Sequence, residues 1–78
     1  MTMSHRYHIN LFWSDEDECW IADVPDLTNC SAHGPTPEAA LAEVENAISA
    51  WLAIQVEAGR PAPEPRFRPA IYAARDAA

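Results

Sequence analysis

Alternating hydrophobic and polar positions near the start of the chain predict two β-strands, over residues 6–13 and 19–24. One face of the first strand carries Tyr7, Ile9, Leu11 and Trp13, and the opposite face carries Phe12. One face of the second carries Trp20, Ala22 and Val24, and the other carries Cys19, Ile21 and Asp23. The short polar run between them predicts an antiparallel hairpin.

The pattern then changes to a turn and a third, shorter strand. Pro25 cannot donate to a strand ladder and Asp26 suits a turn, so we expect the second strand to end there. Leu27 would anchor the loop. A third strand is predicted over residues 30–33, ended by Gly34 and a proline.

A helix is predicted from Pro37 to about Ala58. Thr36 is a suitable N-cap, proline fits the first helical position, and Gly59 is placed to follow the C-cap. The helix repeats apolar residues every three or four positions, which predicts one buried face. That face comprises Ala40, Leu41, Val44, Ala47, Ile48, Trp51, Leu52 and Gln55.

These elements predict an α+β fold, an antiparallel sheet of three to four strands with one long helix packed on one face, in a single domain over residues 1–78. Its core spans about 6–59. Residues 60–65 are a proline-rich, extended exit, and 66–78 form an edge strand or a tail. Because one helix covers only one face, we expect a homo-oligomer, a dimer or tetramer. The expected interface residues are Phe12, Ile21, Phe67, Arg68 and Ile71.

The charge of the chain is unevenly distributed. The formal net charge is −7, made up of −9 over residues 1–57 and +2 over residues 58–78. A negative body repels phosphate backbones, so we expect no direct nucleic-acid binding. The four arginines of the tail are expected to form ion pairs within or between subunits.

An acidic run over residues 15–18 is the clearest candidate site, with Asp23 beside it in sequence. The carboxylates would attract a basic protein partner and steer its association. The alternative is a solvated hairpin loop with no binding role. The candidate partner-binding residues are Asp15, Glu16, Asp17, Glu18 and Asp23.

The remaining reactive side chains do not predict catalysis or a metal site. Cys19, Cys30 and His33 lack the spacing of a zinc site, and we expect both cysteines to be reduced thiols. Cys30 and His33 lack a group that would orient them as a nucleophile and base. We therefore expect no catalytic residues, no cofactor and no enzymatic activity. Trp13, Trp20 and Trp51 are expected in the core or at a subunit interface.

No run of residues predicts a membrane span, and the first six residues do not resemble a signal peptide. We expect a cytoplasmic protein that binds no membrane.

Several motifs occur in an order that resembles the HicB antitoxin family. They are the acidic hairpin, Trp20-Ile-Ala-Asp-Val-Pro-Asp-Leu27, the Cys30-to-Gly34 strand, Thr36-Pro-Glu-Ala-Ala-Leu41, and Gly59 with Pro61 and Pro63. Two local departures are Thr28-Asn29 where the family often has Pro-Gly, and Pro35 where an acidic residue is frequent.

The resemblance implies a partial ribonuclease-H-like fold with β-β-β-α-β order. It also implies an acidic antitoxin that masks HicA, a small basic mRNA interferase. Typical members continue into a DNA-binding domain that represses their own operon, and these 78 residues leave no room for one. The alternative to a toxin-masking module is therefore a stand-alone oligomeric domain with another binding function.

Overall fold

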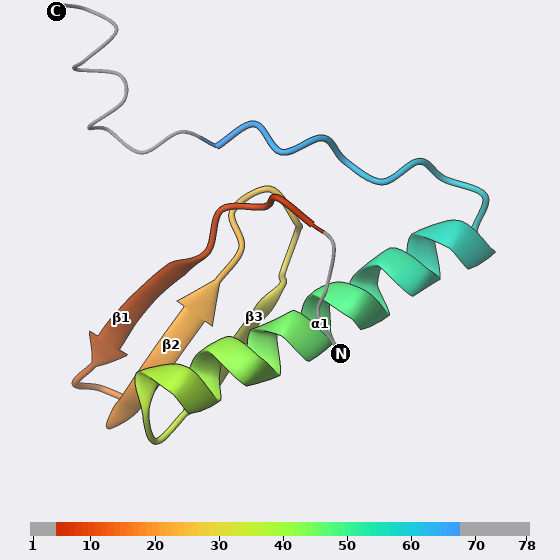
Figure 1. Cartoon of the computed structure of the whole chain (residues 1–78). Helices are drawn as coiled ribbons and strands as arrows, with labels where there is room; N and C mark the ends of the chain where they lie inside the picture. The colour runs from red at the N-terminus through yellow and green to blue at the C-terminus, as the bar shows by residue number, and fades with distance from the viewer. Residues whose placement is uncertain (1–4, 68–78) are drawn as a thin grey trace, which may run out of the picture.

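Three β-strands followed by one helix make up the fold in the computed structural model, which describes residues 5–67 (Figure 1). The elements are β1 (Asn10–Ser14), β2 (Cys19–Asp23), β3 (Ser31–Gly34) and α1 (Pro37–Glu57). The strands form one antiparallel sheet in the order β1-β2-β3. This arrangement confirms the predicted α+β fold. Residues 66 and 67 are not in a strand, and the rest of the predicted last strand lies outside the described residues.

The first strand begins four residues later than predicted, at Asn10 rather than Arg6. Its ladder with β2 runs from Asn10 opposite Asp23 to Ser14 opposite Cys19. Continued by two residues, that register would set His8 opposite Pro25, which has no N–H and starts a turn. The ladder therefore ends where β2 turns away.

The connection from β2 to β3 is a compact turn held by backbone hydrogen bonds. The N–H of Leu27 donates to the Val24 carbonyl (3.2 Å), and the N–H of Cys30 donates to the Leu27 carbonyl (3.3 Å). Asn29 adopts a φ of 57°, a left-handed conformation that asparagine tolerates well. Leu27 is buried in this turn, as the sequence predicts.

Helix α1 starts and ends close to the predicted residues. The Thr36 hydroxyl accepts a hydrogen bond from the N–H of Ala39 (3.1 Å), Pro37 is the first helical residue, and Ala58 is the C-cap. Gly34, the last residue of β3, packs directly against the start of the helix. A β-carbon there would lie 2.7 Å from the backbone nitrogen of Ala40, so only glycine fits.

The core lies between α1 and the sheet. Its largest fully buried side chains are Leu27, Ile48, Val24 and Val44. Ala22 and Ala40 are also fully buried, and these small side chains let the helix approach the middle of the sheet closely. Half-buried Trp51 closes one end of this core, and its indole N–H donates to the Thr28 carbonyl (3.0 Å).

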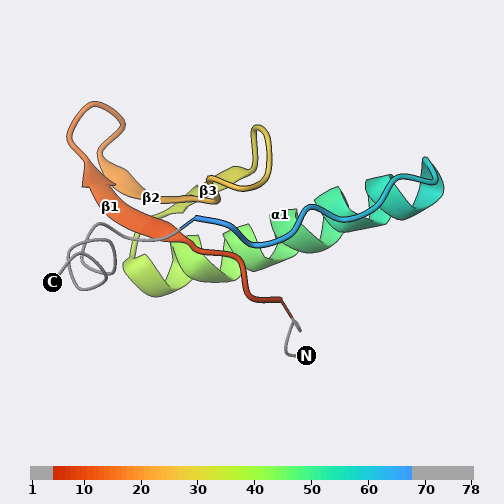
Figure 2. The same cartoon turned by 90° about the horizontal axis from the view of Figure 1, so that it is seen from above.

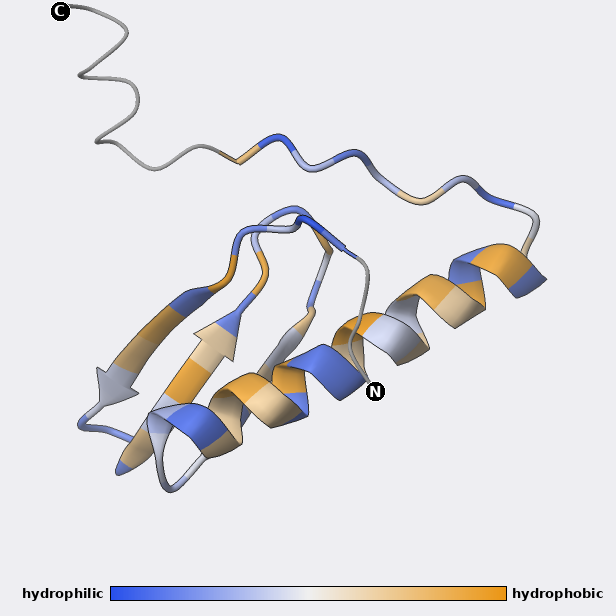
Figure 3. Ribbon diagram, viewed as in Figure 1, coloured by the Kyte–Doolittle hydropathy of each residue, from blue (hydrophilic) through white to orange (hydrophobic). Residues whose placement is uncertain are grey.

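The helix packs mainly against β3 and β2, and β1 lies farthest from it (Figure 1). The register confirms that Leu11 and Trp13 share a face with Ala22 and Trp20. However, Leu11 and Trp13 are 40 % and 47 % exposed, so Trp13 is not a core residue. Leu41, predicted on the buried helix face, is also exposed. Figure 3 shows hydrophobic residues along β1, away from the helix.

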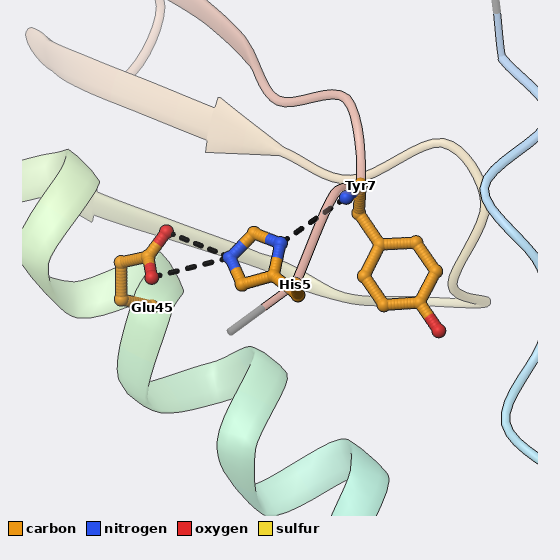
Figure 4. Close-up of polar contacts among 3 residues, drawn as sticks. All are labelled: His5, Tyr7 and Glu45. Carbon is orange, nitrogen blue, oxygen red and sulfur yellow. Dashed lines mark hydrogen bonds and ion pairs between the residues drawn. The ribbon is translucent and has the colours of Figure 1, made fainter. Parts of the chain in front are cut away.

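The chain before β1 is anchored to the helix by His5 (Figure 4). Its Nε2 lies 2.9 Å from a Glu45 carboxylate oxygen, and its Nδ1 accepts a hydrogen bond from the backbone N–H of Tyr7 (3.2 Å). Because Nδ1 accepts, the proton of a neutral ring sits on Nε2 and is donated to the carboxylate. This contact places the Tyr7 ring in the core.

The proline-rich exit runs back from the end of α1 toward the sheet (Figures 1 and 2). Gln55 Nε2 donates to the Pro61 carbonyl (3.2 Å), and the Tyr7 hydroxyl donates to the Pro63 carbonyl. One carboxylate oxygen of Asp26 accepts from the backbone N–H groups of residues 66 and 67 (3.0 and 3.1 Å). The exit is therefore attached at three points along its length.

Truncating a core residue should cost far more stability than truncating an exposed residue of the same type in the same helix. Ile48 is fully buried, so Ile48→Ala should lower the free energy of unfolding by about 2–5 kcal/mol. Ile54 is 60 % exposed, so Ile54→Ala should change it by no more than about 0.5 kcal/mol. Urea unfolding followed by circular dichroism measures both. Equal losses would contradict the assignment of this helix face to the core.

Ionisation of Tyr7 should weaken the fold at alkaline pH. Burial, and secondarily the negative charge of Asp26, raise the pKa of the Tyr7 phenol above its ordinary value. The folded state therefore holds the proton more tightly, and this stabilisation is full below about pH 10 and lost as pH rises through the raised pKa. Tyr7→Phe should be less stable near neutrality, and its stability should fall less steeply above about pH 10 than that of the wild type. If the unfolding free energies of the wild type and of Tyr7→Phe fell in parallel as the pH rose above about 10, the prediction would be contradicted.

Candidate partner-binding surface

The acidic run forms the exposed turn between β1 and β2. All four residues from Asp15 to Glu18 are exposed. The Trp13 indole N–H donates to an Asp15 carboxylate oxygen (2.8 Å), and the Ser14 hydroxyl donates to an Asp17 carboxylate oxygen (3.1 Å). Glu18 closes the turn with a φ of 51°. Two carboxylates therefore shape the turn, while Glu16 and Glu18 have no side-chain hydrogen bond to any described residue.

The charge of this turn is not neutralised within the described part of the chain. There, the one ion pair joins His5 to Glu45, far from the turn in sequence. Residues 5–67 hold 11 acidic and 3 basic residues, because Arg68, Arg75 and Asp76 lie outside this range. The exposed turn therefore carries a local negative potential that no cation within residues 5–67 cancels.

Asp23 is separated from the acidic turn. It lies at the opposite end of β2, facing Asn10 on one neighbour and Ser31 on the other. Five strand residues at about 3.3 Å each place it roughly 15 Å from the turn. The structure therefore brings Asp15 to Glu18 together, and it leaves Asp23 out of that cluster.

The residues proposed for an oligomer interface fall in two places. Phe12, Ile21 and His33 occupy adjacent positions on three strands and so share the sheet face opposite α1. Phe12 is 48 % exposed, and Ile21 is half-buried. The Phe67 ring instead lies against His8, with ring centroids 4.4 Å apart. Arg68 and Ile71 lie outside the described residues.

The arginines of the described exit make no ion pairs there. Arg60 Nε donates to the Gln55 amide oxygen (3.2 Å), and only the backbone of Arg66 contacts Asp26. The predicted intrachain ion pairs are thus not formed by these two arginines within residues 5–67.

Cys19 and His33 line a hollow of about 310 Å³ on the open sheet face, with Asp17 and Ile21. Cys30 is buried on the other side of the sheet, whereas His33 is exposed. Burial, and secondarily the charge of Asp23, raise the pKa of the Cys30 thiol, so it stays protonated near neutral pH. Both cysteines are free thiols. Within residues 5–67, no three histidine, cysteine or carboxylate side chains converge as metal ligands.

A family model described as UPF0150-like matches residues 6–63, which is 58 of the 78 residues. The chain belongs to the UPF0150-like family. The match covers β1, β2, β3 and α1 together with most of the proline-rich exit. Neither the curated proteins nor the solved structures include a match. The acidic turn and the exposed β1 strand of this UPF0150-like chain both lie inside the matched region.

One surface feature was not identified from the sequence, the exposure of β1 on both of its faces. Leu11 and Trp13 face the helix side and Phe12 faces the other, yet all three are at least 40 % exposed. Alternation alone assigns residues to faces and does not tell how far the helix extends over them. The signal available in the sequence was the number of predicted strands, because a single helix is too narrow to cover a whole sheet of three or four strands.

The UPF0150-like chain shows no helix, within its described residues, of the length and hydrophobicity that crossing a bilayer requires.

Proposed function

We propose that this chain is a HicB-like antitoxin module that binds and masks a small basic HicA-type mRNA interferase. The observation that carries the proposal is its membership of the UPF0150-like family, which is related to HicB-like antitoxins. In this proposal the chain acts by binding in the cytoplasm, with no enzymatic activity of its own and no cofactor. It makes no direct contact with nucleic acid.

The charge distribution supports a basic protein partner. The acidic turn projects four carboxylates from the β1–β2 hairpin, and no cation within residues 5–67 pairs with them. Complementary charge speeds the encounter of two proteins and disfavours partners of the wrong sign. A nuclease that binds RNA must present a positive surface, and an acidic turn is suited to occupy it.

The alternative is a stand-alone oligomeric domain with another binding function. The exposed apolar residues of β1 favour it, because surfaces of this kind mark protein–protein contacts. The two proposals are separable, since only the first requires a toxic partner.

Co-expression tests the masking function directly. The chain should co-purify with a short basic protein encoded beside it, and it should restore growth when that protein is toxic to cells. Absence of such a neighbour, together with no binding to any HicA-type toxin and no growth rescue, would overturn the proposal.

Neutralising the acidic turn should weaken binding to a purified HicA-type toxin. Glu16→Gln/Glu18→Gln leaves the hydrogen-bonded aspartates intact, so the turn keeps its shape. We expect the Kd to rise about tenfold at low salt, mainly through slower association, and the effect to shrink at high salt. Glu57→Gln/Glu64→Gln removes the same charge from exposed positions outside the turn and serves as the control. Titration calorimetry and stopped-flow kinetics measure both. Equal effects of the two double variants would show that net charge alone, and not the turn, governs binding.

A further inference from the structure

Strand β3 forms one edge of the sheet and borders a hollow beside α1. Among the described residues β3 pairs only with β2, so its other side is not used by the sheet. A hollow of about 460 Å³ lies between this edge and the helix. Its lining residues are Ser31, Ala32, His33, Glu43, Asn46 and Ala47. None of them belongs to the acidic turn, so this is a separate surface.

The register of the sheet shows which backbone groups of β3 face outward. The Val24 N–H donates to the Cys30 carbonyl (3.0 Å), which makes these two residues a hydrogen-bonded pair. Hydrogen-bonded and non-hydrogen-bonded pairs alternate along an antiparallel ladder. The backbone groups of Ala32 are therefore directed at β2, whereas the N–H and C=O groups of Ser31 and His33 point away from it.

Both ends of the described chain lie on the β1 side of the molecule. His5 contacts Glu45, which follows Glu43 by two residues and so lies roughly 200° around the helix axis from it. Phe67 packs on His8, which comes two residues before β1. The strand order places β1 at the opposite edge of the sheet from β3 (Figure 1). Within residues 5–67, the elements that flank the hollow are therefore β3 and α1 alone.

We propose that the β3 edge binds an extended, arginine-containing segment of a basic partner protein, which adds to the sheet as an antiparallel strand. Two residues of this segment exchange hydrogen bonds with Ser31 and His33. The residue between them lies opposite Ala32, which packs against the core on the helix side of the sheet. Its side chain therefore points to the same side and enters the hollow. This inference goes beyond the proposed toxin masking and does not depend on it.

The chemistry of the hollow favours arginine at that central position. Half-buried Ala32 and Ala47 offer apolar surface to the aliphatic stem of the side chain. Glu43 is exposed and forms no ion pair within residues 5–67, so its carboxylate is available to a guanidinium group. The amide oxygen of Asn46 is a further acceptor. Neither β3 nor α1 contains a lysine or arginine that would repel the bound charge, and His33 faces the other side of the sheet.

A second copy of the chain suits this edge poorly. Antiparallel pairing of β3 with another β3 would set two copies of Ala32 opposite each other, so the hollow would receive no cation. It would also bring two α1 helices, each with an exposed Glu43, to one junction, where like charges repel. The charge at this edge therefore favours a partner of different sequence.

A synthetic peptide tests whether binding occurs by strand addition. The probe is acetyl-Ala-Thr-Val-Arg-Val-Thr-Ala-amide, and NMR titration of the ¹⁵N-labelled full chain locates its site. The backbone amide signals of residues 31–34 and 43–47 should shift, and those of residues 15–18 should not. Methylating the backbone nitrogen of the valine before the arginine removes a donor that faces β3, so it should raise the Kd at least about tenfold. Methylating the arginine nitrogen, which points away from β3, is the matched control and should leave the Kd nearly unchanged.

Charge reversal tests the role of Glu43 in the same complex. Glu43→Arg should weaken binding of the arginine peptide at least about fivefold. A peptide with glutamate in place of arginine should bind this variant more tightly than it binds the wild type. Glu57 is exposed near the end of the same helix, so Glu57→Arg makes the same change of net charge and should bind the arginine peptide like the wild type. Circular dichroism verifies that both variants are folded.

Three results would each overturn the proposal. The amide signals of residues 31–34 could stay unchanged at every peptide concentration, as expected if another segment of the chain occupies this edge. The shifts could instead fall on residues 15–18, which would show general attraction of a basic peptide to the acidic turn. The two methylated peptides could bind equally well, which would exclude strand addition. Growth rescue tests toxin masking separately, so the failure of either proposal is distinguishable from failure of the other.

Discussion

The width of a single helix is the constraint on which this structure depends. An α-helix with its side chains is about 10 Å across, and neighbouring strands lie about 4.8 Å apart, so one helix covers roughly two strands. In this chain α1 covers β3 and β2, where Ala22 and Ala40 allow close contact. Residues 5–67 leave the remaining strand, β1, partly uncovered on both faces, since Leu11, Phe12 and Trp13 are 40–48 % exposed.

That constraint places two chemically different surfaces side by side. The exposed apolar strand β1 leads directly into the acidic turn at residues 15–18. An apolar centre with a charged rim is typical of protein–protein interfaces. These two surfaces of the UPF0150-like chain are the ones that the proposed binding of a protein partner would use.

The predictability of the structure follows the range of the interactions involved. Thr36, Pro37 and Gly59 act on their immediate neighbours, so the limits of the helix could be predicted within one residue. The hairpin and its register follow from alternation and a short polar turn. The predicted start of β1 was wrong by four residues. The observed start depends on where Pro25 ends the partner strand, and the alternation within residues 6–13 carries no information about Pro25.

The site was predictable only in part, for a similar reason. Consecutive acidic residues are visible in the sequence, and their exposure in a turn follows from their position. The separation of Asp23 from them follows from the strand length. In contrast, two sets of hydrogen bonds join segments 40 to 56 positions apart. One connects Asp26 to the N–H groups of residues 66 and 67, and the other connects the Tyr7 hydroxyl to the Pro63 carbonyl. Such contacts have no local pattern, so only the folded chain shows them.

Amide hydrogen exchange in the free and the bound chain tests most directly whether β1 and the acidic turn form the proposed partner surface. When a purified HicA-type toxin is bound, exchange of the N–H groups of residues 11–18 should slow, while exchange in α1 should stay constant. Unchanged exchange over residues 11–18, in a complex whose formation is verified by titration calorimetry, would contradict the account.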